Sequence, residues 1–448
     1  MQQKATNMAL NGNSTSFQLV GAANFKRHNP KSDKFPVQRF HSVEFWCADA
    51  TNTYKRFQHG LGMTLVAHSD QSTGNSAFAS YVLRSNELVF TFTAPYAKSV
   101  SKNSAPGCVP LPHYAVDDAR AFIASHGLAV KALGLVVDDA NVAYEASVKN
   151  GAIPATPPFT LQDKSSGLSQ VVAEVKLYGD VVLRYISGNV VEVPYLVGYS
   201  PVTDSPQISY GLRRLDHAVG NVHNLCEAMD YIMKFTGFHE FCEFTAEDVG
   251  TVDSGLNSVV LANNNEYVLM PVNEPTFNTP RKSQIQTFLE QNEGPGMQHL
   301  ALKTDDIITT LTEMRKRSQN GGFDFMPRPS DKYYRDLPRK VGDSISPTLL
   351  AQCEDLGILV DKDDQGVLLQ IFTKPLGDRP TVFIEIIQRV GCMPGDMVST
   401  TNTAKAVREG GGPADEPQAA GCGGFGKGNF HELFKRIEDY ERTLNIGS

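Results

Sequence analysis

Short runs in which apolar and polar residues alternate recur along the chain, and most of them are bounded by Gly, Pro or Asn. Such runs predict β-strands, and helix-like stretches stand between some of them. The runs are 78–84, 88–93, 171–178 and 181–186 in the first half, and 258–262, 267–272, 366–372 and 382–388 in the second. We therefore expect an α+β protein with two similar halves.

The strands that open these modules are also repeated. The predicted strand 39–45, which a helix follows, matches 215–222, and 133–139 matches 300–306. An Asp at the end of each strand of the second pair is expected to cap the helix that follows. Each half thus contains two modules of one strand, one helix and three strands (βαβββ). Paired modules of this kind form a half-open barrel, and the arrangement resembles the vicinal oxygen chelate superfamily.

The repeat and the segments between its units predict the domain organisation. We expect a disordered N-terminal tail over 1–35, a metal-free barrel over 36–195, a linker over 196–209 and a catalytic barrel over 210–448. The first acidic residue is Asp33, which is also typical of a plastid transit peptide. The weak amphipathic pattern and the single Arg of this segment favour a tail, and hence a cytoplasmic protein.

Composition excludes several classes of function. With 41 Lys and Arg against 49 Asp and Glu, the chain lacks the basic surplus of a nucleic-acid-binding protein. No apolar run approaches the roughly 18 residues of a membrane-spanning helix. The seven cysteines are odd in number and never spaced as CxxC, so neither a disulfide framework nor a structural zinc site is expected.

Three residues of ligand type lie on three separate predicted strands of the second half: His217, His299 and Glu385. Two imidazoles and one carboxylate form the facial triad that holds non-haem Fe(II), although the residue types alone would also suit zinc. Glu385 stands in the middle of a strand that looks buried on both faces. Because an unpaired buried carboxylate costs several kcal/mol, it should bind a metal or pair with Arg389 or Lys303.

The first half serves as a control for these ligands. Alignment of the two halves places Ala132 opposite His299 and Arg184 opposite Glu385. His41 remains as the counterpart of the first histidine, but one imidazole does not hold a transition metal. We therefore expect one metal per chain and a structural role for the first half.

Four segments carry a resemblance to a known family. They are 294–301 (GPGMQHLA), 370–375 (QIFTKP), 383–389 (FIEIIQR) and 423–430 (GGFGKGNF). The chain resembles the 4-hydroxyphenylpyruvate dioxygenases, and most of all their plant branch, from about residue 35 to residue 441. The resemblance implies one Fe(II) per chain and conversion of 4-hydroxyphenylpyruvate and O₂ to homogentisate and CO₂. It further implies a role in tyrosine breakdown, a supply of plastoquinone and tocopherol precursors, and a homodimer.

The resemblance also implies a substrate pocket. Its expected members are Ser258, Asn273, Gln284, Gln298, Gln370, Phe372, Phe383, Phe425, Asn429 and Phe430. Among these, catalytic roles are expected for Gln298, Gln370, Phe372 and Phe430, with the two phenylalanines on either side of the substrate ring. Neutral amides suit such a pocket because they donate or accept hydrogen bonds without adding charge. A helix over about 429–445 is expected to act as a lid that screens the site from water.

Three other functions share parts of this pattern. Hydroxymandelate synthase uses the same substrate and metal but gives a different product. A glyoxalase-type isomerase would need a fourth protein ligand, and a ligand-sequestering protein would need no metal.

Overall fold

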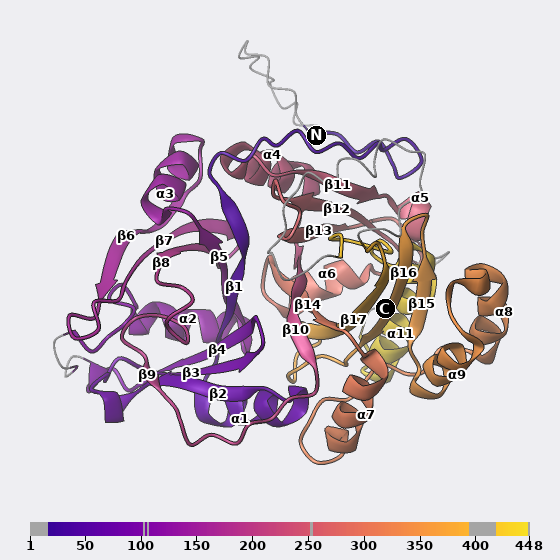
Figure 1. Ribbon diagram of the computed structural model, residues 1–448. Helices are drawn as coiled ribbons and strands as arrows, with labels where there is room; N and C mark the ends of the chain where they lie inside the picture. Colours follow the sequence, from indigo (N-terminus) through magenta and orange to yellow (C-terminus); the bar gives the residue numbers. More distant parts are fainter. Residues whose placement is uncertain (1–16, 102–103, 105–106, 251–253, 394–417, 447–448) are drawn as a thin grey trace, which may run out of the picture.

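The chain folds into two mixed β-sheets that stand side by side (Figure 1), one of nine and one of eight strands. This computed structural model describes residues 17–101, 104, 107–250, 254–393 and 418–446. Each sheet curves into a half-open barrel, so the α+β class and the paired-barrel architecture are confirmed. No helix in these ranges is both long and apolar enough to cross a membrane.

The first half contains two modules in sequence. The first consists of β1 (Val37–Trp46), α1 (Ala50–Leu61), β2 (Thr64–Ser69), β3 (Phe78–Ser85) and β4 (Leu88–Pro95). After α2 (Val116–His126), the second consists of β5 (Ala129–Val137), α3 (Ala140–Lys149), β6 (Pro154–Gln162), β7 (Ser169–Tyr178) and β8 (Val181–Gly188). The expected linker contains β9 (Ser200–Pro201), which pairs with β2 at the edge of this sheet.

The second half repeats this plan with insertions. Its first module consists of β10 (Leu212–Asn221), α4 (Leu225–Thr236), β11 (His239–Phe244), α5 (Ala246–Val249), β12 (Leu256–Ala262) and β13 (Leu269–Pro275). After α6 (Gln284–Gln291) come β14 (Gly296–Thr304), α7 (Ile307–Ser318), α8 (Asp331–Val341), α9 (Pro347–Leu356), β15 (Leu359–Lys362), β16 (Gly366–Phe372) and β17 (Phe383–Gly391). The chain ends in α11 (Phe430–Thr443).

Strand order confirms that the two halves are equivalent. The first sheet runs β6-β7-β8-β5-β1-β4-β3-β2, and the second runs β15-β16-β17-β14-β10-β13-β12-β11. Each module helix begins at an Asp or Asn whose side chain accepts a backbone N–H of the first turn: Asp49, Asp139, Asn224 and Asp306. Caps of this kind contribute about 1 kcal/mol each and fix where the chain turns from strand to helix. The expected capping roles of Asp139 and Asp306 are confirmed.

The two halves share one hydrophobic core. A single cluster of buried side chains extends from β1, β4 and β5 to β10, β13 and β14. Tyr178 of β7 reaches across this interface, and its hydroxyl lies 3.6 Å from the Met297 sulfur. Its ring also fills the space beside Gly220 on β10, where any Cβ would overlap it. Only glycine therefore fits at this point of β10.

Part of the expected N-terminal tail is bound to the second half (Figure 1). Lys34 N–H donates to the Thr236 carbonyl over 2.8 Å, and Ala22 N–H donates to an Asp248 carboxylate oxygen over 2.9 Å. The Arg27 guanidinium lies 3.6 Å from the centre of the Phe241 ring. Residues 17–34 thus follow the β11 side of the sheet, whereas residues 1–16 lie outside the described part of the chain.

Candidate metal centre

Three side chains from three adjacent strands converge in the second half. His217 lies on β10, His299 on β14 and Glu385 on β17. Glu385 Oε2 lies 3.2 Å from His217 Nε2 and 3.4 Å from His299 Nε2, and the three ligand atoms all lie within 4.8 Å of one another. The fold therefore brings together the three residues that the sequence predicts as metal ligands.

Neighbouring side chains set the proton positions on both imidazoles. His217 Nδ1 lies 2.9 Å from Asp216 Oδ1, and His299 Nδ1 lies 2.9 Å from Gln298 Oε1. Since both partners are acceptors, each Nδ1 donates its proton and each Nε2 keeps its lone pair. Two imidazole nitrogens and one carboxylate oxygen, aimed at one point, fit the ligand set of non-haem Fe(II).

Electrostatics at this point favour a cation. Burial would raise the pKa of Glu385, but the two imidazoles lower it to about 2, so the carboxylate is ionised. Burial lowers the pKa of both histidines and prevails at His299, whereas contacts with Asp216 and Glu385 raise the pKa of His217. Gln370 Nε2 donates to Glu385 Oε1 over 2.8 Å, which leaves Oε2 facing the imidazoles.

A pocket of about 620 Å³ opens from this point. All ten residues predicted for the substrate site line it, together with the three predicted metal ligands. Nine further lining residues were not predicted as members of the pocket, and eight of them are apolar side chains: Val219, Phe244, Leu256, Val260, Pro271, Gly426, Leu433, Phe434 and Ile437. Strand alternation could have found Val219, which stands two residues after His217 and so shares its face.

The pocket amides form two hydrogen-bonded groups. Asn429 Nδ2 donates to Gln370 Oε1 over 3.0 Å, which connects the start of α11 to the residue that holds Glu385. On the other side, Asn273 Nδ2 donates to Asn221 Oδ1 over 3.1 Å. Asn221 is fully buried at the end of β10 and was not predicted. It orients Asn273, so the amides are held in place before substrate arrives.

Aromatic rings surround the metal ligands. The Phe383 ring stacks on His299 with centroids 4.9 Å apart, and Phe372 meets the same imidazole edge-on at 6.0 Å. Phe425 lies edge-on to His217 at 5.1 Å. Phe430 packs on Phe244 from the opposite wall, at 5.6 Å. These rings form apolar walls on several sides of the three predicted metal ligands.

Arg389 does not pair with Glu385, so that alternative for the buried carboxylate is wrong. Its guanidinium instead bonds both oxygens of Asp216, at 2.7 and 2.9 Å. Burial would raise the pKa of Asp216, but Arg389 and His217 hold it well below its usual value. The carboxylate next to the first metal ligand is therefore ionised and fully paired.

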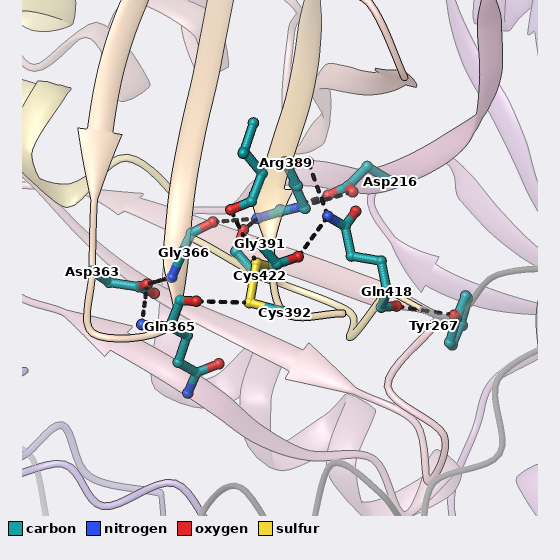
Figure 2. The surroundings of a disulfide bond; sticks show 12 residues. Asp216, Tyr267, Asp363, Gln365, Gly366, Arg389, Gly391, Cys392, Gln418 and Cys422 are labelled. Carbon is teal, nitrogen blue, oxygen red and sulfur yellow. Dashed lines mark hydrogen bonds and ion pairs between the residues drawn. A yellow bond between two sulfur atoms is a disulfide. The ribbon is translucent and has the colours of Figure 1, made fainter. Parts of the chain in front are cut away.

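The sequence analysis expected no disulfide framework, but the structure contains a disulfide between Cys392 and Cys422 (Figure 2). It joins the end of β17 to the chain that returns toward α11. Cysteine spacing could not reveal it, because the two residues are 30 apart and the fold alone makes them neighbours. The other five cysteines are free.

The sequence comparison of the two halves predicts that the first half lacks the second and third ligands, and strand pairing agrees. Gly134 pairs with Arg184 across β5 and β8, as Ala301 pairs with Glu385 across β14 and β17. Arg184 therefore occupies the carboxylate position. Ala132, two residues before Gly134, occupies the position of the second histidine.

Strand pairing corrects the third position. Ser42 pairs with Gly134 as His217 pairs with Ala301, and both strands have an irregularity just before this pair. Ser42, and not His41, is thus the counterpart of His217. Because side chains alternate between the two faces of a strand, the shift by one residue removes His41 from the ligand position. None of the three ligands is present in the first half.

The chain is similar to known proteins over nearly its full length. A protein named 4-hydroxyphenylpyruvate dioxygenase from Plectranthus scutellarioides is 59% identical over 432 residues, which cover 96% of this chain and 94% of that protein. Proteins of the same name from Daucus carota and Arabidopsis thaliana are 57% and 56% identical and cover 99% and 96% of this chain, and 97% and 94% of their own lengths. No protein-family model matches.

One solved structure supports the fold. A triple mutant of 4-hydroxymandelate synthase from Streptomyces coelicolor superimposes with a TM-score of 0.69 at 21% identity, over 91% of this chain and 99% of that one.

Proposed function

The chain belongs to the 4-hydroxyphenylpyruvate dioxygenase family, and we propose that it converts 4-hydroxyphenylpyruvate and O₂ to homogentisate and CO₂. One Fe(II) per chain would be held by His217, His299 and Glu385. The observation that carries this proposal is the convergence of these three ligand atoms within 4.8 Å at the end of an aromatic pocket. A bound Fe(II) supplies O₂ activation at the coordination positions that three protein ligands leave open.

The charge of the pocket wall indicates how an α-keto acid would have to bind. Among the described residues that line the pocket, none is Lys or Arg. The carboxylate and keto oxygens of the substrate therefore have no side-chain cation to meet, and the metal position is where their charge is compensated. A substrate anchored there would extend its ring into the space bounded by Phe372, Phe383 and Phe430.

The amides are proposed to act at defined atoms. Gln370 holds Glu385 and is itself held by Asn429. Gln298 fixes the proton of His299 through its oxygen, so its NH₂ group is left to donate toward the pocket. We assign the phenol oxygen to the other polar side chains of the pocket, which are Ser258, Asn273 and Gln284.

We further propose that Phe425, Phe430 and α11 form a lid. The helix packs Phe434 against α6 and places Ile437 beside Phe372 and Phe383. Its removal should leave the metal ligands in place but admit water to the site. A chain that stops at Gly428 is expected to bind Fe(II) and to consume O₂ in excess of homogentisate formed. A chain that stops at Thr443 keeps α11 and is the matched control.

Product analysis tests the reaction itself. Protein loaded anaerobically with Fe(II) and mixed with 4-hydroxyphenylpyruvate should consume O₂ and release homogentisate and CO₂ in equal amounts, measured by an oxygen electrode and by liquid chromatography with mass spectrometry. The structural likeness to 4-hydroxymandelate synthase makes 4-hydroxymandelate the alternative product. Formation of 4-hydroxymandelate, or turnover without added metal, would contradict the proposal.

We also infer a homodimer in the cytoplasm. The resemblance to the plant branch supports the dimer, and the weak amphipathic pattern of the first 32 residues supports the location. Light scattering should give twice the mass of one chain. A fluorescent fusion should remain outside plastids, and import into isolated plastids would contradict the location.

A further inference from the structure

Arg389 lies between the first metal ligand and the C-terminal segment 418–426. Its side chain, 1% exposed, holds Asp216 with two hydrogen bonds. Asp216 in turn accepts the His217 Nδ1 proton. Arg389 thus holds the carboxylate that fixes the tautomer and ring direction of a predicted metal ligand, and such partners typically change metal affinity about 10–100-fold.

The remaining nitrogen of Arg389 faces the C-terminal segment. Nη1 donates to the Cys422 carbonyl over 2.6 Å and to the Gly424 carbonyl over 2.7 Å. Figure 2 shows Arg389 beside Cys422 and Asp216. The guanidinium carbon lies 5.5 Å from the centre of the Phe425 ring, whose edge meets the His217 imidazole. Two sets of contacts therefore connect His217 with Arg389, one through Asp216 and one through the Phe425 ring.

Two further contacts fasten this segment to β17. The Gln418 amide donates to the carbonyls of Arg389 and Gly391, each over 2.9 Å, and the disulfide joins Cys422 to Cys392 (Figure 2). These contacts hold the segment near the strand, but neither reaches the metal ligands. The contacts of Arg389 differ, because Arg389 also bonds Asp216, and Asp216 bonds the predicted metal ligand His217.

We propose that Arg389 is a positioning residue that makes the orientation of His217 depend on the seating of the Cys422–Phe425 segment. With the segment in place, its two carbonyls and Asp216 together satisfy the guanidinium. If the segment leaves, Arg389 loses two buried acceptors and its bidentate hold on Asp216 loosens. This inference rests on the metal assignment of the proposed function.

His299 lacks such a connection and serves as an internal contrast. Its Nδ1 bonds a neutral amide, Gln298, rather than an ion pair. The coupling should therefore act through one imidazole only. By reciprocity, metal binding should in turn stabilise the segment.

Co(II) binding to the full chain tests the proposal without turnover. Arg389→Met and Asp216→Asn should each weaken Co(II) binding about 10–100-fold by calorimetry and alter the visible Co(II) spectrum. Arg184→Met, which removes an equally buried arginine from the first half, should destabilise the protein but leave Co(II) affinity unchanged. If the wild-type chain binds no Co(II), the metal assignment fails, whereas an unchanged affinity in both variants overturns the positioning role alone.

Hydrogen exchange tests the coupling itself. In the wild-type chain, Co(II) should slow amide exchange over residues 418–426, and this protection should be absent in Arg389→Met. Protection of the same size in the variant would overturn the coupling, because it would show that Phe425 or the disulfide transmits it. If Arg389→Met does not fold, Arg389→Lys decides: it keeps the charge but not all four hydrogen bonds, so affinity and protection should both fall.

Discussion

The two halves of this chain have the same strand order, but the side chains that point into the two half-barrels differ in charge and in chemical type. In the second half, His217, His299 and Glu385 converge at a point that fits a metal ion. In the first half, the equivalent positions carry Ser42, Ala132 and Arg184. The guanidinium of Arg184 supplies the positive charge permanently, so this half-barrel needs no ion.

The substitution of a guanidinium for a metal site required further changes. Arg184 bonds Glu44 at 2.7 Å and Glu174 at 2.6 Å, and its third partner is the Tyr195 hydroxyl at 3.1 Å. Glu44 occupies the position that Val219 holds in the second half, where it lines the pocket. One half thus satisfies its buried charges within the protein, and the other leaves them for a ligand.

The largest expected effect is on catalysis, where substitution of Glu385 and substitution of Glu44, the buried carboxylates of the two halves, should give different results. Glu385→Gln should lower kcat/KM at least about 100-fold, since loss of a ligand should exceed the effect of a supporting residue. Glu44→Gln, the matched change in the first half, should leave the kcat/KM of the folded protein near that of the wild type. Steady-state kinetics in aerated buffer, after anaerobic loading with Fe(II), give kcat/KM for both variants, and iron analysis gives their metal content. Full activity and full iron content in Glu385→Gln would remove this residue from the site.

Stability should show the reverse order. Arg184→Met leaves Glu44 and Glu174 without their cation and should cost about 3–5 kcal/mol of unfolding free energy. In a chain that already carries Glu44→Gln, Arg184→Met should cost less unfolding free energy than it costs in the wild-type chain, because one of the two unpaired charges is absent. Denaturant unfolding measures both. A loss below about 1 kcal/mol, the usual value of an exposed pair, would mean that the network is not needed.

Acid should also affect the halves differently. Burial, with help from nearby arginines, lowers the pKa of His41 to about 3 from its usual 6.5. Between these two pH values the unfolded chain binds a proton on His41 and the folded chain does not. The contribution of neutral His41 to folding stability is therefore complete above pH 6.5 and decreases as the pH is lowered. In the second half, the pKa of His217 is raised and that of His299 is lowered, so their effects on stability in this pH window have opposite signs. The depressed pKa values of Asp216 and Glu385 reduce stability only as the pH falls below about 4.5.

His41→Gln should therefore flatten the loss of stability between pH 6.5 and 4.5, at roughly 1.4 kcal/mol per pH unit. Urea unfolding at several pH values gives the slope for each protein. Equal slopes in the variant and the wild type would show that His41 is protonated in the folded state.

The smallest expected effect is the absence of a second binding event. Anaerobic titration with Fe(II) should reach saturation at one ion per chain. Two equivalents of comparable affinity would contradict the comparison between the halves, since the first half offers no ligand at any of the three positions.

The sequence predicted those features that repeat or that lie close together along the chain. The module plan, the caps of α3 and α7 and the three metal ligands all follow from periodic patterns or from comparison of the two halves. The pocket residues came from family resemblance, and the fold gathers all of them at one cavity. Their individual roles remain predictions.

Long-range polar contacts were not predictable in the same way. Asp216 and Arg389 are 173 residues apart, and neither has a local pattern that points to the other. Segment 17–34 is bound to the second half partly through backbone and polar side-chain hydrogen bonds, and such bonds leave no signal in hydrophobic periodicity. The shift at His41 had a different cause, because a strand irregularity misaligned two histidines that look equivalent in the sequence.

The contact between Tyr178 and Gly220 limits how independently the halves can change. Gly220 stands three residues after His217 on β10, and the Tyr178 ring lies against it from the first half. The first barrel therefore helps to fix the position of β10, the strand that carries the first predicted ligand. A larger residue at either position would displace β10 and His217 with it. A substitution in the first half can therefore change catalysis without contacting the site.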